Sequence, residues 1–305
     1  MGTIKLVKAL KDIRQLKKEA DVVLEDIIVE RYPELESAYD RWSDTYRMNT
    51  TAVCAYMAYH FCRLEGVDFD SDRKKKAYVS TAAAVISDDL IDYKIVKDAS
   101  EAYMLQSSGI TDKNTHYLKA LFNAFNSYLE EILPDSFCTE FKELIEQYNL
   151  AQEKSLMLDE DISKDDIILI KNGTGGYPSL LLYSIMFPEN EDHVKDIDPS
   201  YPVNSKLPSK KSQAIFNYGV MVSHLDDIMD LNYDKIMGKK SLATEGIISW
   251  DSLNSDIRYV GSGLEKFYPK KNVKDVMNLF SPTSIRTVLF MLNMLERISR
   301  FSSSR

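Results

Sequence analysis

The chain has 305 residues, of which 44% are hydrophobic and 28% are charged, and its formal net charge is −9. This is the composition of an ordinary folded protein, and the negative balance excludes nucleic-acid binding, because phosphate backbones select basic surfaces. The 11 glycines and 9 prolines are too few for a turn-rich β fold, and no stretch is long and apolar enough for an integral membrane span.

Helical periodicity dominates the chain. Apolar residues recur at steps of three and four near residues 6–16 and 22–28. Further helices are expected over 50–64, 74–97, 114–133, 135–158, 178–187, 209–232 and 273–299. Breaks are expected at Gly66, Gly109, Pro134, Gly173–Gly176 and Pro188–Pro208. The sequence therefore predicts an all-α, single-domain helical bundle over residues 1–305.

A first aspartate cluster follows the apolar run that ends at Ile86. Helical spacing places Asp88 and Asp92 on one face, with Asp89 beside them. The alternative is a solvated acidic face. The apolar run argues against it, because partly buried carboxylates are costly unless a cation neutralises them.

A second cluster repeats this arrangement later in the chain. Asp226, Asp230 and Asp234 are spaced by four residues on one predicted helix, and Asp227 lies next to the first of them. Oxygen ligands without His or Cys select hard cations, Mg²⁺ first, held together with substrate phosphates and water. Two such clusters predict a magnesium–diphosphate site. Among the histidines, only His224 could face it.

The two clusters, with the stretch DDIMDLNYDKIMGKKSLATEGIIS at residues 226–249, resemble the class I isoprenoid synthases. The similarity is closest to trans-prenyl diphosphate synthases and terpene synthases. It implies a bundle in which two aspartate-rich helices face each other across a central apolar cavity. It also implies three Mg²⁺ ions, an allylic prenyl diphosphate substrate and a homodimer. The absence of a signal-peptide pattern indicates a cytoplasmic protein.

The resemblance gives roles to several other side chains. Lys171 and Lys239 correspond to catalytic lysines that contact the diphosphate, and Arg47, Lys97 and Gln152 correspond to further diphosphate-binding residues. From the residues alone, Lys171 is equally well explained as a solvent-facing side chain beside a break in the helix.

Ala84 and Ala83 precede the first cluster by four and five residues, respectively. In the family that this chain resembles, these positions form the floor of the chain pocket, so small residues imply room for a prenyl chain of C15–C20 or longer. Tight helix packing is the alternative explanation of the alanines.

Departures from the family pattern separate two reactions. The stretch around Arg47 lacks the arginines that hold isopentenyl diphosphate in elongating members, and Lys97 stands where those members have two arginines. These losses favour a terpene synthase, which cyclises one prenyl diphosphate. The GK…EG tail favours the alternative, a chain-elongating synthase that condenses isopentenyl diphosphate with an allylic diphosphate. A non-catalytic partner subunit is the third hypothesis, and the intact aspartates argue against it.

Overall fold

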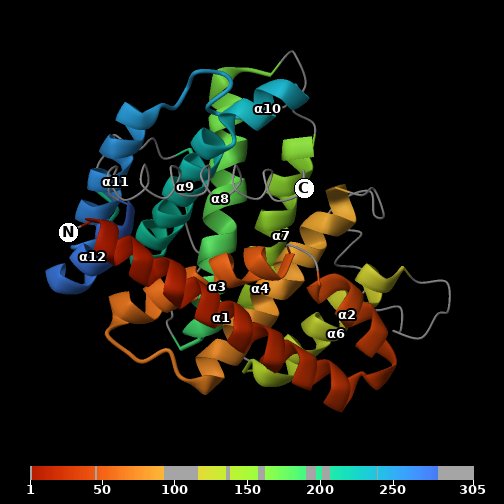
Figure 1. Cartoon of the computed structure of the whole chain (residues 1–305). Helices are drawn as coiled ribbons and strands as arrows, with labels where there is room; N and C mark the ends of the chain where they lie inside the picture. Colours follow the sequence, from red (N-terminus) through yellow and green to blue (C-terminus); the bar gives the residue numbers. More distant parts are fainter. Residues whose placement is uncertain are drawn as a thin grey trace, which may run out of the picture.

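The computed structural model describes residues 2–44, 47–92, 116–134, 138–156, 162–189, 197–200, 207–238 and 240–280. Within these ranges every regular element is a helix, and the helices pack as a single bundle (Figure 1). The all-α prediction is therefore confirmed for the described part of the chain. None of its helices is long and apolar enough to cross a membrane.

The helices in chain order are α1 (Gly2–Arg31), the 3₁₀ helix η1 (Pro33–Leu35), α2 (Glu36–Ser43), α3 (Arg47–Glu65), α4 (Ser71–Asp92), α6 (Tyr117–Ile132), α7 (Cys138–Leu156), α8 (Lys164–Met186), α9 (Lys211–Met229), α10 (Leu231–Met237), α11 (Trp250–Leu264), α12 (Lys270–Met277) and the 3₁₀ helix η4 (Asn278–Phe280).

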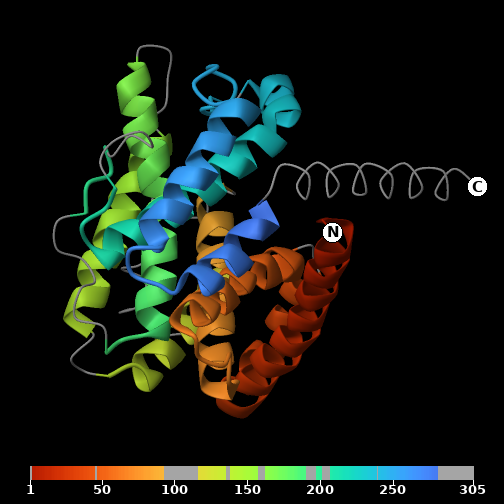
Figure 2. The ribbon, with the colours of Figure 1, turned by 90° about the vertical axis from the view of Figure 1, so that its left-hand side faces the viewer.

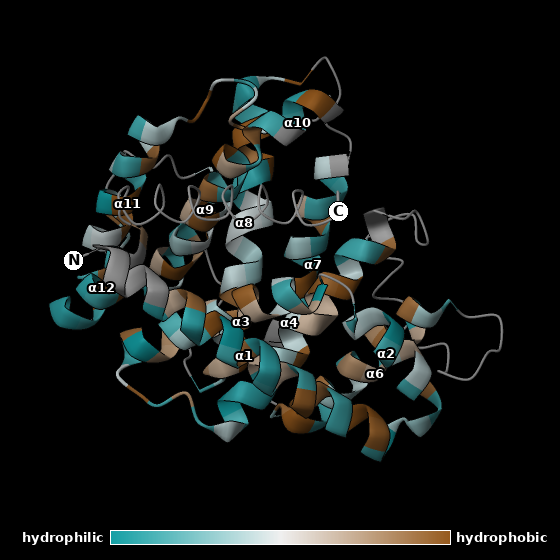
Figure 3. Ribbon diagram, viewed as in Figure 1, coloured by the Kyte–Doolittle hydropathy of each residue, from teal (hydrophilic) through white to brown (hydrophobic). Residues whose placement is uncertain are grey.

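Buried side chains form two hydrophobic cores. The first core gathers residues of α1, α2, α4 and α6 around Trp42 and Phe125. The second core gathers residues of α8, α9, α11 and α12 around Tyr183 and Phe216. Figure 2 shows α1 at one side of the bundle and α7 and α8 at the other. The outer face of α1 is largely hydrophilic, whereas the central helix α9 is rich in apolar residues (Figure 3). Burying these apolar faces is what holds the helices together.

The predicted helix break at Gly173–Gly176 is wrong, because α8 runs through it without interruption. The glycines serve close packing instead. A Cβ atom on Gly173 would lie 2.8 Å from Ala151 Cβ of α7, and one on Gly176 would lie 2.4 Å from the Phe216 ring of α9. Any larger side chain would push the helices apart.

The contact between α8 and α9 is the closest of these approaches. A Cβ atom on Gly175 would lie 2.4 Å from Ser223 Cβ, and one on Gly219 would lie 2.4 Å from the Gly175 carbonyl oxygen and 2.3 Å from Ser179 Oγ. We call this line of small residues, Gly175, Ser179, Gly219 and Ser223, the α8–α9 seam. It brings the backbones of the two helices together near the centre of the bundle (Figure 1).

Candidate metal and diphosphate site

The first aspartate cluster lies at the end of the described part of α4. Asp88 is exposed to solvent, whereas Asp89 is buried with 2% of its surface accessible. The Asp89 carboxylate forms an ion pair with the guanidinium of Arg47, the first residue of α3. Arg47, predicted to bind diphosphate, therefore neutralises an aspartate in this structure. Asp92 ends α4, and its side chain lies outside the described residues.

A hydrogen-bonded chain from α7 reaches the first cluster. Gln152 Nε2 donates to the Tyr148 hydroxyl at 2.9 Å, and this hydroxyl donates to Asp88 Oδ1 at 3.5 Å. Gln152, predicted to bind diphosphate, therefore reaches the site through Tyr148. The sequence reasoning missed Tyr148. The available signal was its spacing of four residues from Gln152, which places both side chains on one face of a helix.

The second cluster spans the junction between α9 and α10. Asp226 and Asp227 lie in the last turn of α9, Asp230 is the residue between the two helices, and Asp234 belongs to α10. The helix predicted over 209–232 is therefore confirmed over 211–229, and it ends before Asp230. The chain bends at Asp230, and α10 ends at Gly238, whose φ of +64° is the left-handed conformation that glycine adopts readily.

Lys171 of α8 lies against the second cluster. Its Nζ atom is 3.3 Å from Asp227 Oδ1, and the other carboxylate oxygen, Oδ2, accepts a hydrogen bond from the Leu242 backbone N–H at 2.9 Å. Lys171 is thus not solvent-facing beside a helix break. It comes from the middle of a continuous helix, and the α8–α9 seam lies just beyond it.

The carboxylates of the second cluster repel one another. Desolvation of the carboxyl group, followed by the charges of Asp230 and Asp227, raises the pKa of Asp226 from 3.8 to about 6, and Lys171 offsets only part of this effect. The position at the C-terminal end of α9 adds to the repulsion, because the last carbonyl groups of a helix carry partial negative charge. The carboxylates therefore create a local potential that attracts a cation.

Cys54, on the same helix as Arg47, links the two clusters electrostatically. Burial raises the pKa of its thiol to about 12, and the charges of both Asp88 and Asp226 contribute. Because the charges of both carboxylates act on this half-buried thiol, Asp88 and Asp226 both lie within electrostatic range of it. The other described cysteine, Cys62 of the same helix, is buried in the second core.

The two clusters share one arrangement. In each, the second aspartate (Asp89 or Asp227) is buried and paired with a cationic side chain of the protein, and the first (Asp88 or Asp226) is exposed. Among the described side chains, no three His, Cys, Asp or Glu residues converge closely enough to enclose a metal ion. The exposed aspartates of the two clusters offer only oxygen ligands, and their carboxylates repel one another. Such ligands nevertheless suit Mg²⁺, which keeps several waters and binds one or two carboxylates together with substrate phosphates.

A small pocket lies beside the first cluster. Helices α4, α6, α7 and α8 enclose it, and its lining includes Ala83, Ala84, Ser87, Phe122 and Tyr148. Because Tyr148 also donates to Asp88, the pocket adjoins the first cluster. Its volume is about 60 Å³, whereas ligand pockets are typically about 300–1,000 Å³. Both alanines line this small pocket, and their role as the floor of a prenyl-chain pocket stays a prediction, as does the larger central cavity.

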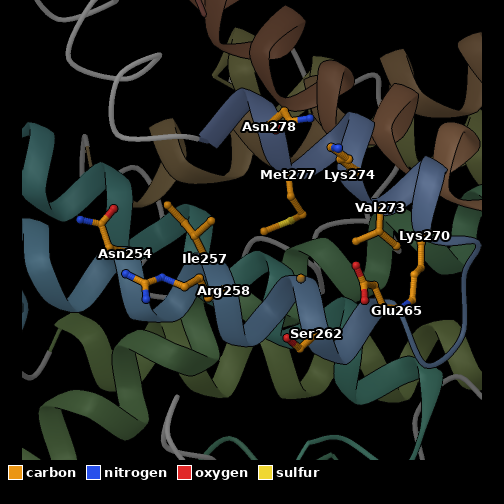
Figure 4. Close-up of a pocket in the computed structure, with 11 residues that line it drawn as sticks. Asn254, Ile257, Arg258, Ser262, Glu265, Lys270, Val273, Lys274, Met277 and Asn278 are labelled. Atoms are coloured by element: carbon orange, nitrogen blue, oxygen red, sulfur yellow. The ribbon is translucent and has the colours of Figure 1, made fainter.

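A larger groove of about 810 Å³ lies between α11 and α12 (Figure 4). Side chains of both helices point into it, among them Arg258, Lys270 and Met277. None of the predicted site residues that the structure describes lines this groove. Among its described lining residues only Glu265 is acidic, so they do not include the clustered carboxylates on which the metal-site prediction depends.

Two predicted site residues, Lys97 and Lys239, lie outside the described residues. Comparison of the chain with protein-family models, with curated proteins and with solved structures finds no match. The resemblance to isoprenoid synthases therefore rests on the sequence motifs alone.

Proposed function

We propose that this chain is a Mg²⁺-dependent class I isoprenoid synthase that ionises an allylic prenyl diphosphate of C15–C20 or longer, releases diphosphate and cyclises the remaining chain. The observation that carries this proposal is the arrangement that the two aspartate clusters share, in which a buried aspartate paired with a protein cation (Asp89 with Arg47, Asp227 with Lys171) follows an exposed one. Each cluster has an exposed carboxylate and a neighbouring protein cation.

The side chains of the site fit the demands of this chemistry. Mg²⁺, when bound, would stabilise the negative charge that develops on the leaving diphosphate. Asp88, Asp226 and Asp230 would hold the ions from both sides, and Lys171 would contact diphosphate oxygens from α8. The pocket beside Ala84 would take the start of the prenyl chain and exclude water from it.

The ion pair between Arg47 and Asp89 favours cyclisation over elongation. An elongating enzyme needs cationic groups for a second diphosphate in addition to those that serve the first. Arg47 was the candidate for that role in the N-terminal half, and its guanidinium is bound to a buried carboxylate. Withdrawing it would leave Asp89 buried without its counter-charge, which is costly.

The test is an incubation of the full chain with Mg²⁺ and C10, C15 or C20 allylic diphosphates, with and without isopentenyl diphosphate. A hydrocarbon or alcohol released without isopentenyl diphosphate supports the proposal. Longer diphosphates formed only in its presence would replace cyclisation by elongation. If no substrate is turned over, the chain is better explained as a partner subunit.

Two substitutions connect turnover to the clusters. Asp88→Ala and Asp226→Ala should each abolish turnover and leave the helical circular dichroism spectrum unchanged. The matched control is Asp68→Ala, which removes an exposed carboxylate from the loop between α3 and α4. Full activity in both site variants would contradict the metal-site assignment. Cytoplasmic location and a homodimer accompany this proposal as predictions.

A further inference from the structure

His224 does not face the aspartate cluster, although it lies only two residues before Asp226. Its side chain is buried with 5% of its surface accessible, and the ring contacts two other helices. Nδ1 lies 2.8 Å from Asp256 Oδ2 of α11, and Nε2 lies 3.3 Å from Asn172 Oδ1 of α8. Asp256 and Asn172 are themselves buried, with 4% and 1% accessible. The three side chains form a closed polar network between α8, α9 and α11.

The orientation of Asn172 is fixed from its other side. Its amide nitrogen Nδ2 donates to the Pro199 carbonyl oxygen at 3.0 Å, which turns Oδ1 toward the histidine. The segment that carries Pro199 is in turn bound to α9, because the Asp198 N–H donates to Gln213 Oε1 at 2.8 Å. Both nitrogens of the His224 ring therefore lie within hydrogen-bond distance of an oxygen atom, so polar contacts hold the ring at both edges.

This network lies directly beside the functional pair. Asn172 follows Lys171 on α8, and His224 precedes Asp227 by three residues on α9. The contact between Asn172 and His224 is thus the neighbour of the 3.3 Å contact between Lys171 and Asp227. The third member, Asp256, lies on α11, which follows the loop that Asp227 holds through the Leu242 N–H. Both contacts depend on the same register of α8 against α9.

The α8–α9 seam explains why a polar network is needed here. The seam itself consists of glycines and serines, so along this line no large side chains interlock to prevent the helices from sliding along one another. Burying a histidine and an aspartate costs more free energy than burying apolar residues of the same size. In return, directional hydrogen bonds specify one register, which apolar packing of small residues does not.

We propose that His224, Asn172 and Asp256 act as positioning residues, which set the distance between Lys171 and the second aspartate cluster. His224 is the centre of the network because it alone contacts both partners. The geometric part of this proposal stands by itself, and its consequence for diphosphate binding rests on the proposed function.

A double-mutant cycle tests the geometric part without any ligand. Lys171→Met, Asp227→Asn and the double variant are compared by urea unfolding, first with His224 intact and then with H224Q. With His224 intact, we expect the coupling between Lys171 and Asp227 to change the unfolding equilibrium constant by about fivefold. With H224Q it should fall below twofold, and D256N, which keeps the histidine, should lower it as well.

The control is His60→Gln, which also removes a buried histidine, one whose Nδ1 lies 2.7 Å from the Tyr218 hydroxyl. It should destabilise the fold but leave the coupling between Lys171 and Asp227 unchanged. An equal loss of coupling in His60→Gln, no loss in H224Q and D256N, or no coupling in the unsubstituted chain would each overturn the proposal.

A second measurement uses Mg²⁺ with inorganic diphosphate as the probe, followed by calorimetry. We expect H224Q to weaken diphosphate binding about tenfold, and to have no further effect when Lys171→Met is already present. Additive losses would show that His224 does not act through Lys171, which overturns the proposal. If the unsubstituted chain does not bind the probe, the proposed function fails, and the unfolding cycle alone decides the positioning role.

Discussion

The α8–α9 seam gives the sharpest prediction about the fold, the substitution Gly219→Ala. The added methyl group would lie 2.4 Å from the Gly175 carbonyl oxygen, and ordinary contact begins at 3.4 Å, so the two helices would have to separate by about 1 Å. A backbone oxygen cannot rotate away as a flexible side chain would. The substitution therefore strains the seam itself.

The expected magnitude follows from two opposing effects. Replacing glycine by alanine inside a helix stabilises it by about 1 kcal/mol, whereas overpacking a close contact costs about 1–3 kcal/mol. Because the clash involves Ser179 Oγ at 2.3 Å as well as backbone, we expect a cost at the upper end and a net loss of about 1–2 kcal/mol. Urea unfolding followed by circular dichroism measures this free energy.

Gly261→Ala in α11 is the matched control. There the new methyl group would lie 3.7 Å from Met277 Cγ, which is an ordinary contact, so the helix propensity should stabilise the chain by up to about 1 kcal/mol. The two substitutions thus have the same chemistry and opposite expected signs. If Gly219→Ala proves as stable as Gly261→Ala, the close approach of α8 and α9 is refuted.

Three further predictions concern the site. Asp89→Asn should destabilise the chain by about 3 kcal/mol, because it leaves the guanidinium of Arg47, which is 15% exposed, without its counter-ion. Asp88→Asn should change the melting temperature little. Equal effects of the two substitutions would contradict the different roles of the two aspartates. Since the pKa of Asp226 is raised from 3.8 to about 6, the folded state holds more protons than the unfolded state between these values, and stability should fall as pH rises through them. In metal-free buffer, Asp226→Asn should therefore melt above the parent chain at pH 7 and equal it near pH 3, and no difference at pH 7 would count against the repulsion in the cluster. If the proposed function holds, Ala84→Phe should fill the pocket of about 60 Å³. It should lower kcat/KM about tenfold for the longest substrate but not for the C10 substrate. If the dependence of kcat/KM on substrate chain length is unchanged, this pocket does not hold the prenyl chain.

The helices were predictable wherever apolar residues recur without glycine. The runs at 50–64, 114–133 and 135–158 correspond to α3, α6 and α7. The glycines at 173–176 misled the prediction, because a glycine that ends a helix and one that permits close packing look the same in a sequence. The helix α11 was not predicted, since its Asn, Ser and Gly residues are weak helix formers. Its start depends on a capping box between Ser249 and Ser252.

The site was predictable as a set of aspartates and not as a set of pairs. Spacing alone identified both clusters. The difference in burial and ion pairing between Asp88 and Asp89, however, depends on how α3 packs against α4 and places Arg47 beside Asp89. The same holds for Asp256, which lies 32 residues from His224 in the chain and carries no motif. Contacts between helices that are far apart in sequence leave no periodic signal, so the partners of each charge required the structure.

The helix α3 belongs to both hydrophobic cores, and this has a consequence for spectroscopy. Its Met48 and Ala55 pack in the first core, and its Phe61 and Leu64 pack in the second. The chain has two tryptophans, Trp42 buried in the first core and Trp250 packed against the second. Each indole is therefore a fluorescent reporter of one core. With α3 joining the cores, both emission signals should change at the same denaturant concentration, as a single cooperative unit requires.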